Sequence, residues 1–306
     1  MNLIKPNFWK NNNLIVFLMW PLTLITRLFI LIKNNKIAYK AKINCICVGN
    51  IYLGGTGKTP LVIKLNEILK KKYKIFIIKK NYKDQIDEQK LLKKKTNLII
   101  SRSRVEGIKR LEKNKKNIVI FDDGLQDKSI SYKIKIVCFS SISGIGNGKL
   151  IPAGPLREDL SELINYDAVF INGKKNKYLI NKIKQYNKNI KVFSGRYILK
   201  NKKDFNLKSK YLAFCGIGTP ENFFNLLNEN KIKIKESIVF PDHFNYKSSD
   251  INKIKKLAIE KNLKIITTEK DYVKINKFKN IKVKFANIDL HIDKKTNFKK
   301  FLFKGL

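Results

Sequence analysis

The chain has 306 residues and a formal net charge of +41, from 65 lysines and arginines against 24 aspartates and glutamates. This length can hold two modest α/β domains, and so large a positive charge would ordinarily suggest a nucleic-acid partner. The excess is nearly all lysine, spread along the chain with abundant asparagine and isoleucine, so we attribute it to A/T-rich codons and expect no nucleic-acid partner, only a preference for anionic nucleotides and lipid surfaces.

The first expected element is an apolar helix over residues 14–32. The run is nearly long enough to span a bilayer. However, Arg27 would cost roughly 2.5–3.5 kcal/mol near a helix centre, and Pro21 predicts a kink. We therefore predict that region 1–36 is a membrane-associating helix lying in the cytoplasmic interface. A buried core helix and a true single span are the alternatives.

A glycine-rich loop follows an apolar, strand-like run at residues 43–48. In such a loop, glycines let backbone N–H groups approach phosphate oxygens. A lysine then reaches the β- and γ-phosphates, and a hydroxyl sits on Mg²⁺. A helix beginning near Pro60 would point its positive end at the same anion. The predicted nucleotide-binding residues are Gly54, Gly55, Thr56, Gly57, Lys58 and Thr59.

This loop departs from two familiar patterns. The usual spacing would put a glycine at Tyr52, and Leu53 stands where the MinD/ParA ATPases have a signature lysine. A glycine turn before a purely structural helix is the alternative. The agreement of strand, glycines, Lys-Thr and helix favours a phosphate-binding P-loop.

A second strand, at residues 117–121, ends in two acids, Asp122 and Asp123. Ligands of open α/β sheets bind at the carboxyl ends of strands, and a carboxylate there can hold Mg²⁺ directly or through water. The pair is therefore predicted to be a Walker B element, with capping of the following turn as the alternative. Before it we expect a helix at 60–70, strands at 75–78 and 98–100, a polar loop at 79–89 and a helix at 105–111.

Further strands are expected at 134–139, 168–171, 211–215 and 264–266, with a polar loop at 240–246 and a helix beginning after Thr219. Alternating strands and helices indicate α/β domains with mostly parallel sheets. The four cysteines lie in apolar runs without metal-ligand spacing and are read as buried, reduced side chains. The expected domains are the helix region 1–36, a P-loop kinase domain at 37–190, a linker at 191–210 and a smaller α/β domain at 211–306.

Taken together, these motifs resemble the bacterial tetraacyldisaccharide 4′-kinase family of lipid A biosynthesis. The resemblance runs from about Trp20 to Lys274. It rests on the stretches 48–50, 54–60, 122–126, 146–148, 150–158, 216–224, 240–246 and 267–271.

The resemblance implies an enzyme that uses ATP and Mg²⁺ to phosphorylate the 4′-hydroxyl of a lipid disaccharide 1-phosphate. It also implies a peripheral or monotopic protein on the cytoplasmic face of the bacterial inner membrane. Two α/β/α domains with the active site in the cleft between them are expected, and we expect a monomer.

Carried over by position, Asp87 falls on the family's catalytic aspartate and Glu88 on the acid after it. His243 falls on the histidine that partners the aspartate. Arg104 and Arg157 fall on cleft arginines, and Gln126 follows the Walker B acids within a matching stretch. We place Asp87 and His243 in different domains and expect them to meet when the cleft closes. A carboxylate held by a histidine can accept a sugar hydroxyl proton.

Three departures from the family pattern bear on the site. Asn81-Tyr82 stands where Arg-Gly-Tyr is usual, so Asp84 is the alternative to Asp87 as the base. Asp127 replaces a histidine, and Phe244 replaces the second histidine of an Asp-His-His pattern. The alternative function is a MinD/ParA-like ATPase switch on a membrane, against which Leu53 argues. A non-enzymatic basic binder would not need the intact P-loop and acid pair.

Overall fold

The computed structural model describes residues 6–34, 38–82, 85–112, 114, 116–278 and 281–306. The chain forms two compact units. The large unit contains the described residues of Lys5–Asn81, Lys95–Arg196 and Ile292–Leu306, and the small unit contains those of Tyr82–Lys94 and Tyr197–His291. The chain therefore passes between the units near residues 81 and 95, within the strand β7 and at the end of the strand β12.

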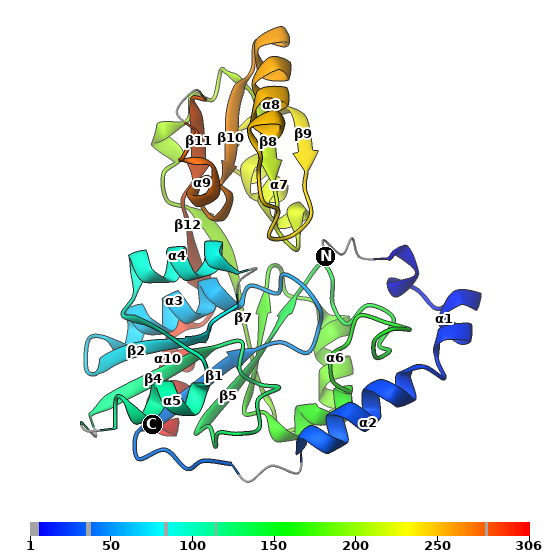
Figure 1. Ribbon diagram of the computed structural model, residues 1–306, viewed down its shortest axis with the longest axis vertical. Coiled ribbons are helices and arrows are strands. Elements are labelled where there is room, and N and C mark those ends of the chain that lie inside the picture. The colour runs from blue at the N-terminus through cyan, green and yellow to red at the C-terminus, as the bar shows by residue number, and fades with distance from the viewer. Residues whose placement is uncertain (1–5, 35–37, 83–84, 113, 115, 279–280) are drawn as a thin grey trace. The chain divides into compact units, whose positions relative to one another are not determined.

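Most helices and strands of the large unit are labelled in Figure 1. In chain order the elements of this unit are η1 (Asn7–Trp9), α1 (Leu14–Met19), α2 (Thr23–Asn34), β1 (Asn44–Gly49), α3 (Lys58–Leu69), β2 (Lys74–Lys80), β3 (Leu98–Ser101), α5 (Arg104–Lys109), β4 (Asn117–Asp122), β5 (Ile134–Ser140), η2 (Leu160–Asn165), β6 (Ala168–Asn172), α6 (Lys177–Tyr186), β7 (Lys191–Leu199) and α10 (Lys295–Gly305).

The small unit has its own sheet and helices. Its elements are α4 (Ile86–Lys95), η3 (Lys202–Asp204), β8 (Lys210–Cys215), α7 (Pro220–Glu229), β9 (Lys233–Val239), α8 (Ser248–Glu260), β10 (Lys264–Thr268), α9 (Glu269–Ile275), β11 (Val283–Ala286) and β12 (Ile288–Ile292).

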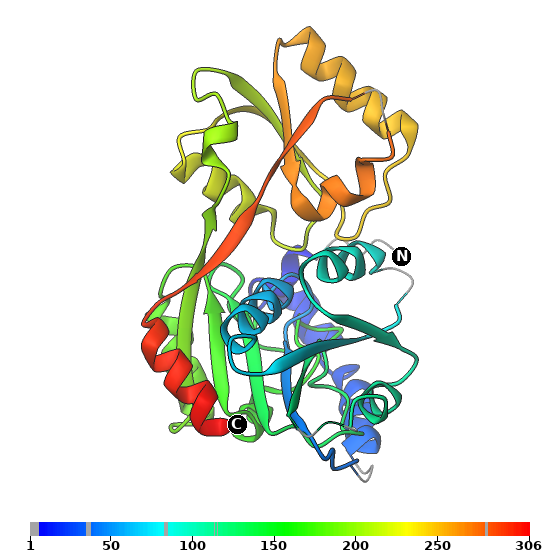
Figure 2. The same cartoon turned by 90° about the vertical axis from the view of Figure 1, so that its left-hand side faces the viewer.

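The large sheet has the strand order β12-β7-β6-β5-β1-β4-β2-β3. The pairings from β3 through to β7 are parallel. The central strands are covered on both faces and are therefore almost continuously apolar; every residue of β4 and β6 is buried. The C-terminal helix α10, red in Figure 2, packs on this sheet through Phe298, whose ring lies 4.8 Å from that of Phe193 on β7.

The order of the strands places the carboxyl end of β1 between those of β4 and β5. Val48 of β1 is in register with Asp122 of β4, and Gly49 is in register with Val137 of β5. The loop that leaves β1 and the acids that end β4 consequently meet at one edge of the sheet. The small unit repeats the parallel arrangement in the order β11-β10-β8-β9. Both sheets confirm the predicted α/β class.

Two stretches differ from the sequence-based expectations. The predicted polar loop 79–89 contains the start of helix α4, and the chain around it, Tyr82–Lys94, belongs to the small unit. The predicted linker 191–210 begins with β7, a strand of the large sheet that pairs with β6. Helix α6 lies in the lysine- and asparagine-rich region before it. The predicted boundaries 37–190 and 211–306 therefore differ from the two units of the structure.

The apolar N-terminal run forms two helices, α1 and α2, which break at residues 20–22 around Pro21, as predicted. It is not a buried core helix, because large apolar side chains on both helices remain exposed: Leu14 is 73 % exposed, Phe17 70 % and Phe29 64 %. Both helices lie on the outside of the large unit (Figure 1). Within the described residues, no helix combines the length and apolar character needed to cross a bilayer.

Candidate active site

The loop from β1 to α3 adopts a conformation that only glycine accepts readily at two points. Gly54 has a φ of 115° and Gly57, directly before α3, a φ of 83°. L-residues with a Cβ rarely tolerate these angles. The Asn50 side chain holds the loop by donating to the carbonyl oxygens of Tyr52 (2.6 Å) and Gly54 (3.0 Å). The first backbone N–H groups of α3 have no partner within the helix and form a natural anion site.

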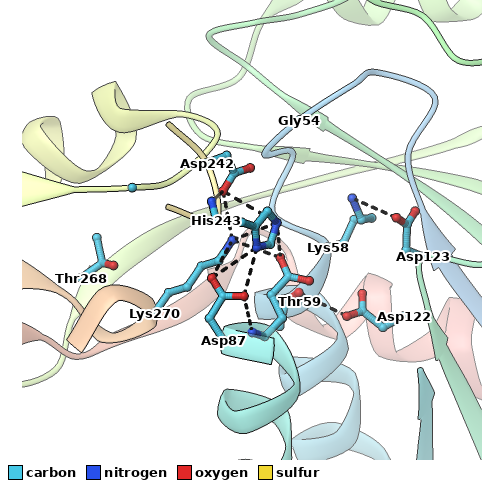
Figure 3. Close-up of polar contacts among 12 residues, drawn as sticks. Gly54, Lys58, Thr59, Asp87, Asp122, Asp123, Asp242, His243, Thr268 and Lys270 are labelled. Carbon is cyan, nitrogen blue, oxygen red and sulfur yellow. Dashed lines mark hydrogen bonds and ion pairs between the residues drawn. The ribbon is translucent and has the colours of Figure 1, made fainter. Parts of the chain in front are cut away.

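An ammonium group and a hydroxyl group at the start of α3 meet the two acids at the end of β4. Lys58 Nζ lies 3.7 Å from Asp123 Oδ2, and Thr59 Oγ donates to Asp122 Oδ2 at 3.3 Å (Figure 3). The structure thus brings together the two motifs that the sequence predicted to form one site. Helix α3 begins at Lys58, two residues before the predicted start.

Asp123 is the more accessible of the two acids, with a side chain 15 % exposed. Its backbone has a φ of 61°, which turns the chain away at the end of β4. Arg157 Nη2 lies 2.9 Å from Asp123 Oδ1. Burial by itself would raise the pKa of Asp123, but the positive charges of Lys58 and Arg157 outweigh it and hold the pKa well below its usual range. Asp123 is therefore ionised at neutral pH.

Asp122 is buried, and its two oxygens have different environments. Oδ2 accepts from Thr59 and pairs with Lys79 at 2.8 Å, whereas Oδ1 is buried without a hydrogen-bond partner among the described residues. Such an atom calls for a ligand. Carboxylate and hydroxyl oxygens suit Mg²⁺, so this donor set fits the metal that a P-loop site would hold. Among the described residues, no group of three or more histidines, cysteines or acids is arranged to hold a metal ion, so a metal here would also need phosphate or water oxygens.

The remaining predicted residues of the large unit brace this edge of the sheet. Arg157 Nη2 also donates to the Asn50 carbonyl oxygen at 2.6 Å. Gln126 Nε2 donates to the same carbonyl (3.0 Å) and to Glu158 (2.8 Å). Arg104, which is buried, pairs with Asp127 at 2.6 Å and donates to the Asp123 carbonyl oxygen. The aspartate that replaces the family's histidine at position 127 is thus the partner of a buried arginine.

A second polar cluster lies in the small unit around Asp87, which is in the first turn of α4 and only 3 % exposed. His243 Nδ1 lies 3.0 Å from Asp87 Oδ1 (Figure 3). The loop between β9 and α8 presents this histidine with a φ of 59°. Its neighbour Phe244, at the position of the family's second histidine, stacks on Phe240 with ring centroids 4.7 Å apart.

Two lysines of α9 complete the cluster around Asp87. Lys270 Nζ lies 3.1 Å from Asp242 and 3.3 Å from Glu88, and Lys274 Nζ lies 3.3 Å from Asp87 Oδ2. Burial would raise the pKa of Asp87, but the hydrogen bond from His243 and the charge of Lys270 lower it to about 2. Burial likewise opposes the charge of Lys270, and its acidic neighbours, Glu88 first, raise its pKa above the usual range.

The pairing corrects one expectation about this site. Asp87 and His243 were expected to lie in different domains and to meet on closure, but both belong to the small unit and are already in contact. The alternative base, Asp84, lies outside the described residues. Sequence reasoning did not single out Lys79, Asp242, Lys270 or Lys274. Lys270 follows the predicted strand 264–266 and lies in the stretch 267–271 that carries the family resemblance, and that position was the available signal.

The ionised state of Asp87 should be visible in the acid stability of the protein. Its pKa is 3.8 in an unperturbed chain and about 2 in the fold. Because the folded value is the lower one, the stabilisation is complete above about pH 4 and is lost as the pH falls towards 2. A lowering of this size corresponds to a stabilisation on the order of 2 kcal/mol. Between pH 6 and pH 3 the free energy of unfolding, measured in urea, should therefore fall further for the parent than for Asp87→Asn.

An exposed acid of the same unit provides the control for this measurement. Asp204→Asn changes an exposed side chain of η3 and should keep the parent's dependence on acid. Equal acid sensitivity of the parent and Asp87→Asn would contradict the assigned charge of Asp87.

A parallel sheet with a glycine loop between β1 and α3 and an acid pair ending β4 defines a P-loop protein of the kinase type. The sequence matches the family Tetraacyldisaccharide-1-P 4'-kinase, LpxK, over residues 15–306. The chain therefore belongs to this family of enzymes, which transfer phosphate to a hydroxyl group.

Individual relatives agree with this assignment. The chain is 40 % identical to the tetraacyldisaccharide 4'-kinase of Pelagibacter ubique (strain HTCC1062), covering 99 % of this chain and 98 % of the relative. It is 34 % identical to that of Rickettsia akari (strain Hartford), covering 92 % and 91 %. A crystal structure of LpxK from Aquifex aeolicus in complex with ATP has the same fold, with a TM-score of 0.71, 24 % identity and coverage of 95 % and 99 %.

Proposed function

We propose that this protein is a tetraacyldisaccharide 4′-kinase, which transfers the γ-phosphoryl group of ATP to the 4′-hydroxyl of a tetraacyldisaccharide 1-phosphate in lipid A biosynthesis. The observation that carries the proposal is the buried, ionised Asp87 held by His243 in a chain that also has a P-loop. A nucleotide-driven switch needs no proton acceptor for an alcohol. A kinase acting on a sugar hydroxyl does.

In this mechanism the residues of the large unit bind the nucleotide. The N–H groups of the loop and of the first turn of α3 surround the phosphates, and Lys58 neutralises charge that develops on the γ-phosphoryl group. Asp123 pairs with Lys58 through Oδ2 and with Arg157 through Oδ1, and so holds both cations beside the loop. Thr59 and Asp122 would hold Mg²⁺, which when bound supplies charge neutralisation to the phosphate oxygens.

The residues of the small unit act on the acceptor. Asp87 accepts the proton of the 4′-hydroxyl as its oxygen forms a bond to the γ-phosphorus and the bond to ADP breaks. Because the pKa of Asp87 is lowered, its carboxylate is ionised and can accept that proton. His243 orients the carboxylate, and Lys270 and Lys274 keep it charged.

The decisive assay is the transfer of radiolabelled γ-phosphate from ATP to a tetraacyldisaccharide 1-phosphate in detergent micelles. We expect a labelled bisphosphorylated lipid. Without the lipid acceptor we expect no release of inorganic phosphate. Phosphate release without lipid labelling would instead favour the membrane-associated ATPase switch.

We further propose that the enzyme works at the cytoplasmic face of the inner membrane as a monomer, with α1 and α2 lying in the lipid interface. Large exposed apolar surfaces mark protein or membrane contacts. The proposed acceptor is itself a membrane lipid, and a net charge of +41 favours an anionic bilayer. Helix α2 contacts the rest of the large unit through its other face. Thr23 is 4 % exposed, and Thr26 donates to the Ile151 carbonyl oxygen at 2.6 Å.

Polar substitutions on the exposed faces of these helices should release the protein from lipid. Phe17 and Phe29 are 70 % and 64 % exposed, so the double variant Phe17→Ser/Phe29→Ser should keep the fold. Each aromatic ring buried in lipid contributes about 2 kcal/mol, so binding to anionic vesicles in a flotation assay should fall at least about tenfold. Ile164→Ser, at a residue 70 % exposed in η2, is the matched control. Undiminished flotation of the double variant would contradict the interfacial placement.

A further inference from the structure

Lys79 is a fully buried lysine at the carboxyl end of β2. Its side chain is 1 % exposed, and its Nζ lies 2.8 Å from Asp122 Oδ2, whose side chain is 0 % exposed. The pairing follows from the sheet: β2 and β4 are parallel neighbours with Ile78 in register with Phe121, so the next residues lie side by side. Buried charges are retained only when paired, and here the partner is one of the two acids assigned to the nucleotide site.

The contacts of Asp122 separate its two carboxylate oxygens. Oδ2 is occupied by Lys79 and by the Thr59 hydroxyl. Oδ1 is buried and lacks a hydrogen-bond partner among the described residues. Lys79 and Thr59 therefore direct one oxygen into the protein and leave the other for a ligand.

The burial of Lys79 limits what it can do. With 1 % of its side chain exposed, it is enclosed by protein, unlike Lys58, whose side chain is 15 % exposed and faces Asp123. Lys79 therefore acts through Asp122 and not on a substrate. Its charge is nevertheless felt by any cation at that carboxylate, because charges interact strongly over short distances in a poorly polarisable interior.

We infer that Lys79 is a positioning residue that competes with the divalent cation for the charge of Asp122. In the metal-free protein Lys79 neutralises the buried acid and keeps the site formed. When a cation binds, the same ammonium group opposes it and limits the gain in nucleotide affinity that the metal brings. This inference rests on the proposed function only in that Asp122 is taken to be a metal ligand.

The test measures how much a metal strengthens nucleotide binding, without catalysis. The dissociation constant of a fluorescent, non-hydrolysable ATP analogue is measured in EDTA and in saturating MnCl₂, and the ratio of the two constants gives the coupling between metal and nucleotide. Lys79→Gln keeps a hydrogen-bond donor without the charge, and Lys79→Met keeps neither. In both variants the ratio should rise on the order of tenfold, since a repelling charge next to the ligand is removed.

Thermal unfolding in EDTA is the second readout. Removing one partner of a buried ion pair leaves the other uncompensated, so both variants should unfold at lower temperature than the parent. Adding MnCl₂ and the analogue should raise the unfolding temperature of the variants by more than it raises that of the parent. Lys64→Gln is the matched control. It removes another largely buried lysine, paired with Glu67 at 2.9 Å on α3, and should leave the ratio unchanged.

A double-mutant cycle with Asp122→Asn locates the effect. In that background, replacing Lys79 should no longer change the ratio, because the shared carboxylate charge is gone. A ratio that stays at the parent value, or falls, in Lys79→Gln overturns the competition. A parent without any metal effect overturns it too, through the metal assignment of Asp122. Metal coupling without transfer of phosphate to the lipid would leave the role of Lys79 standing and refute the proposed acceptor.

Discussion

Replacing Lys58 with alanine is expected to lower kcat for phosphoryl transfer by about 10²-fold or more, on the scale of removing one preorganised electrostatic contact from a transition state. Lys58 is placed by the first turn of α3 and paired with Asp123 at 3.7 Å, so its position beside the loop is set before a nucleotide binds. Initial rates with radiolabelled ATP and lipid acceptor measure the loss.

The protein fold should survive this change. Lys58 contributes a partly exposed side chain, not core packing, and the thermal unfolding midpoint should stay close to that of the parent. Lys64→Ala, on the next turn of the same helix, controls for loss of a lysine near the site. Near-normal turnover by Lys58→Ala would refute the assignment of the loop as the phosphate site.

Replacing Asp87 with asparagine is expected to lower kcat by about 10²–10⁴-fold, the range of a general base, with little change in ATP affinity. Asparagine keeps a hydrogen bond to His243 but cannot accept the proton. His243→Ala should cost less, because the imidazole orients the carboxylate at 3.0 Å and Lys270 and Lys274 still hold it. Steady-state kinetics with varied acceptor and fixed ATP separate kcat from KM.

The two residues should behave as one unit. The double variant is expected to be barely worse than Asp87→Asn alone, because removing either member of a functional unit already removes most of its effect. His291→Gln, at the chain's other histidine, which is exposed in β12, should behave like the parent. Fully multiplicative losses would show that Asp87 and His243 act independently, and an active Asp87→Asn would return Asp84 to consideration.

Much of the P-loop half of the site could be read from the sequence. The apolar runs 43–48 and 117–121 fall largely in the buried parallel strands β1 and β4, and such strands are recognisable because both faces are apolar. The glycines at 54 and 57 adopt backbone angles that only glycine accepts easily, so their presence indicated the loop geometry. The meeting of Lys58 and Thr59 with Asp122 and Asp123 followed from the rule that ligands bind at the carboxyl ends of parallel strands.

The small-unit half could be predicted only as a set of residues. Asp87 and His243 were named through the family resemblance, but their placement in one unit was not. Helix α4 was missed because its ten residues carry four lysines and little apolar character, so periodicity gives a weak signal. Its first turn nevertheless has two acids, which is a helix-start signal.

By itself, the sequence determined the α/β class, the phosphate loop, the acid pair and the family, because each depends on local patterns of burial and backbone freedom. Only the tertiary structure decided that Asp87 is buried beside His243 and two lysines of α9, and that Lys79 is locked onto Asp122. Those pairings join residues 156 and 43 positions apart. In a chain so rich in lysine, composition cannot distinguish the few lysines that are buried and paired. Strand register and chain packing decide which lysines are buried and paired, since they place a carboxylate within reach of each of these lysines.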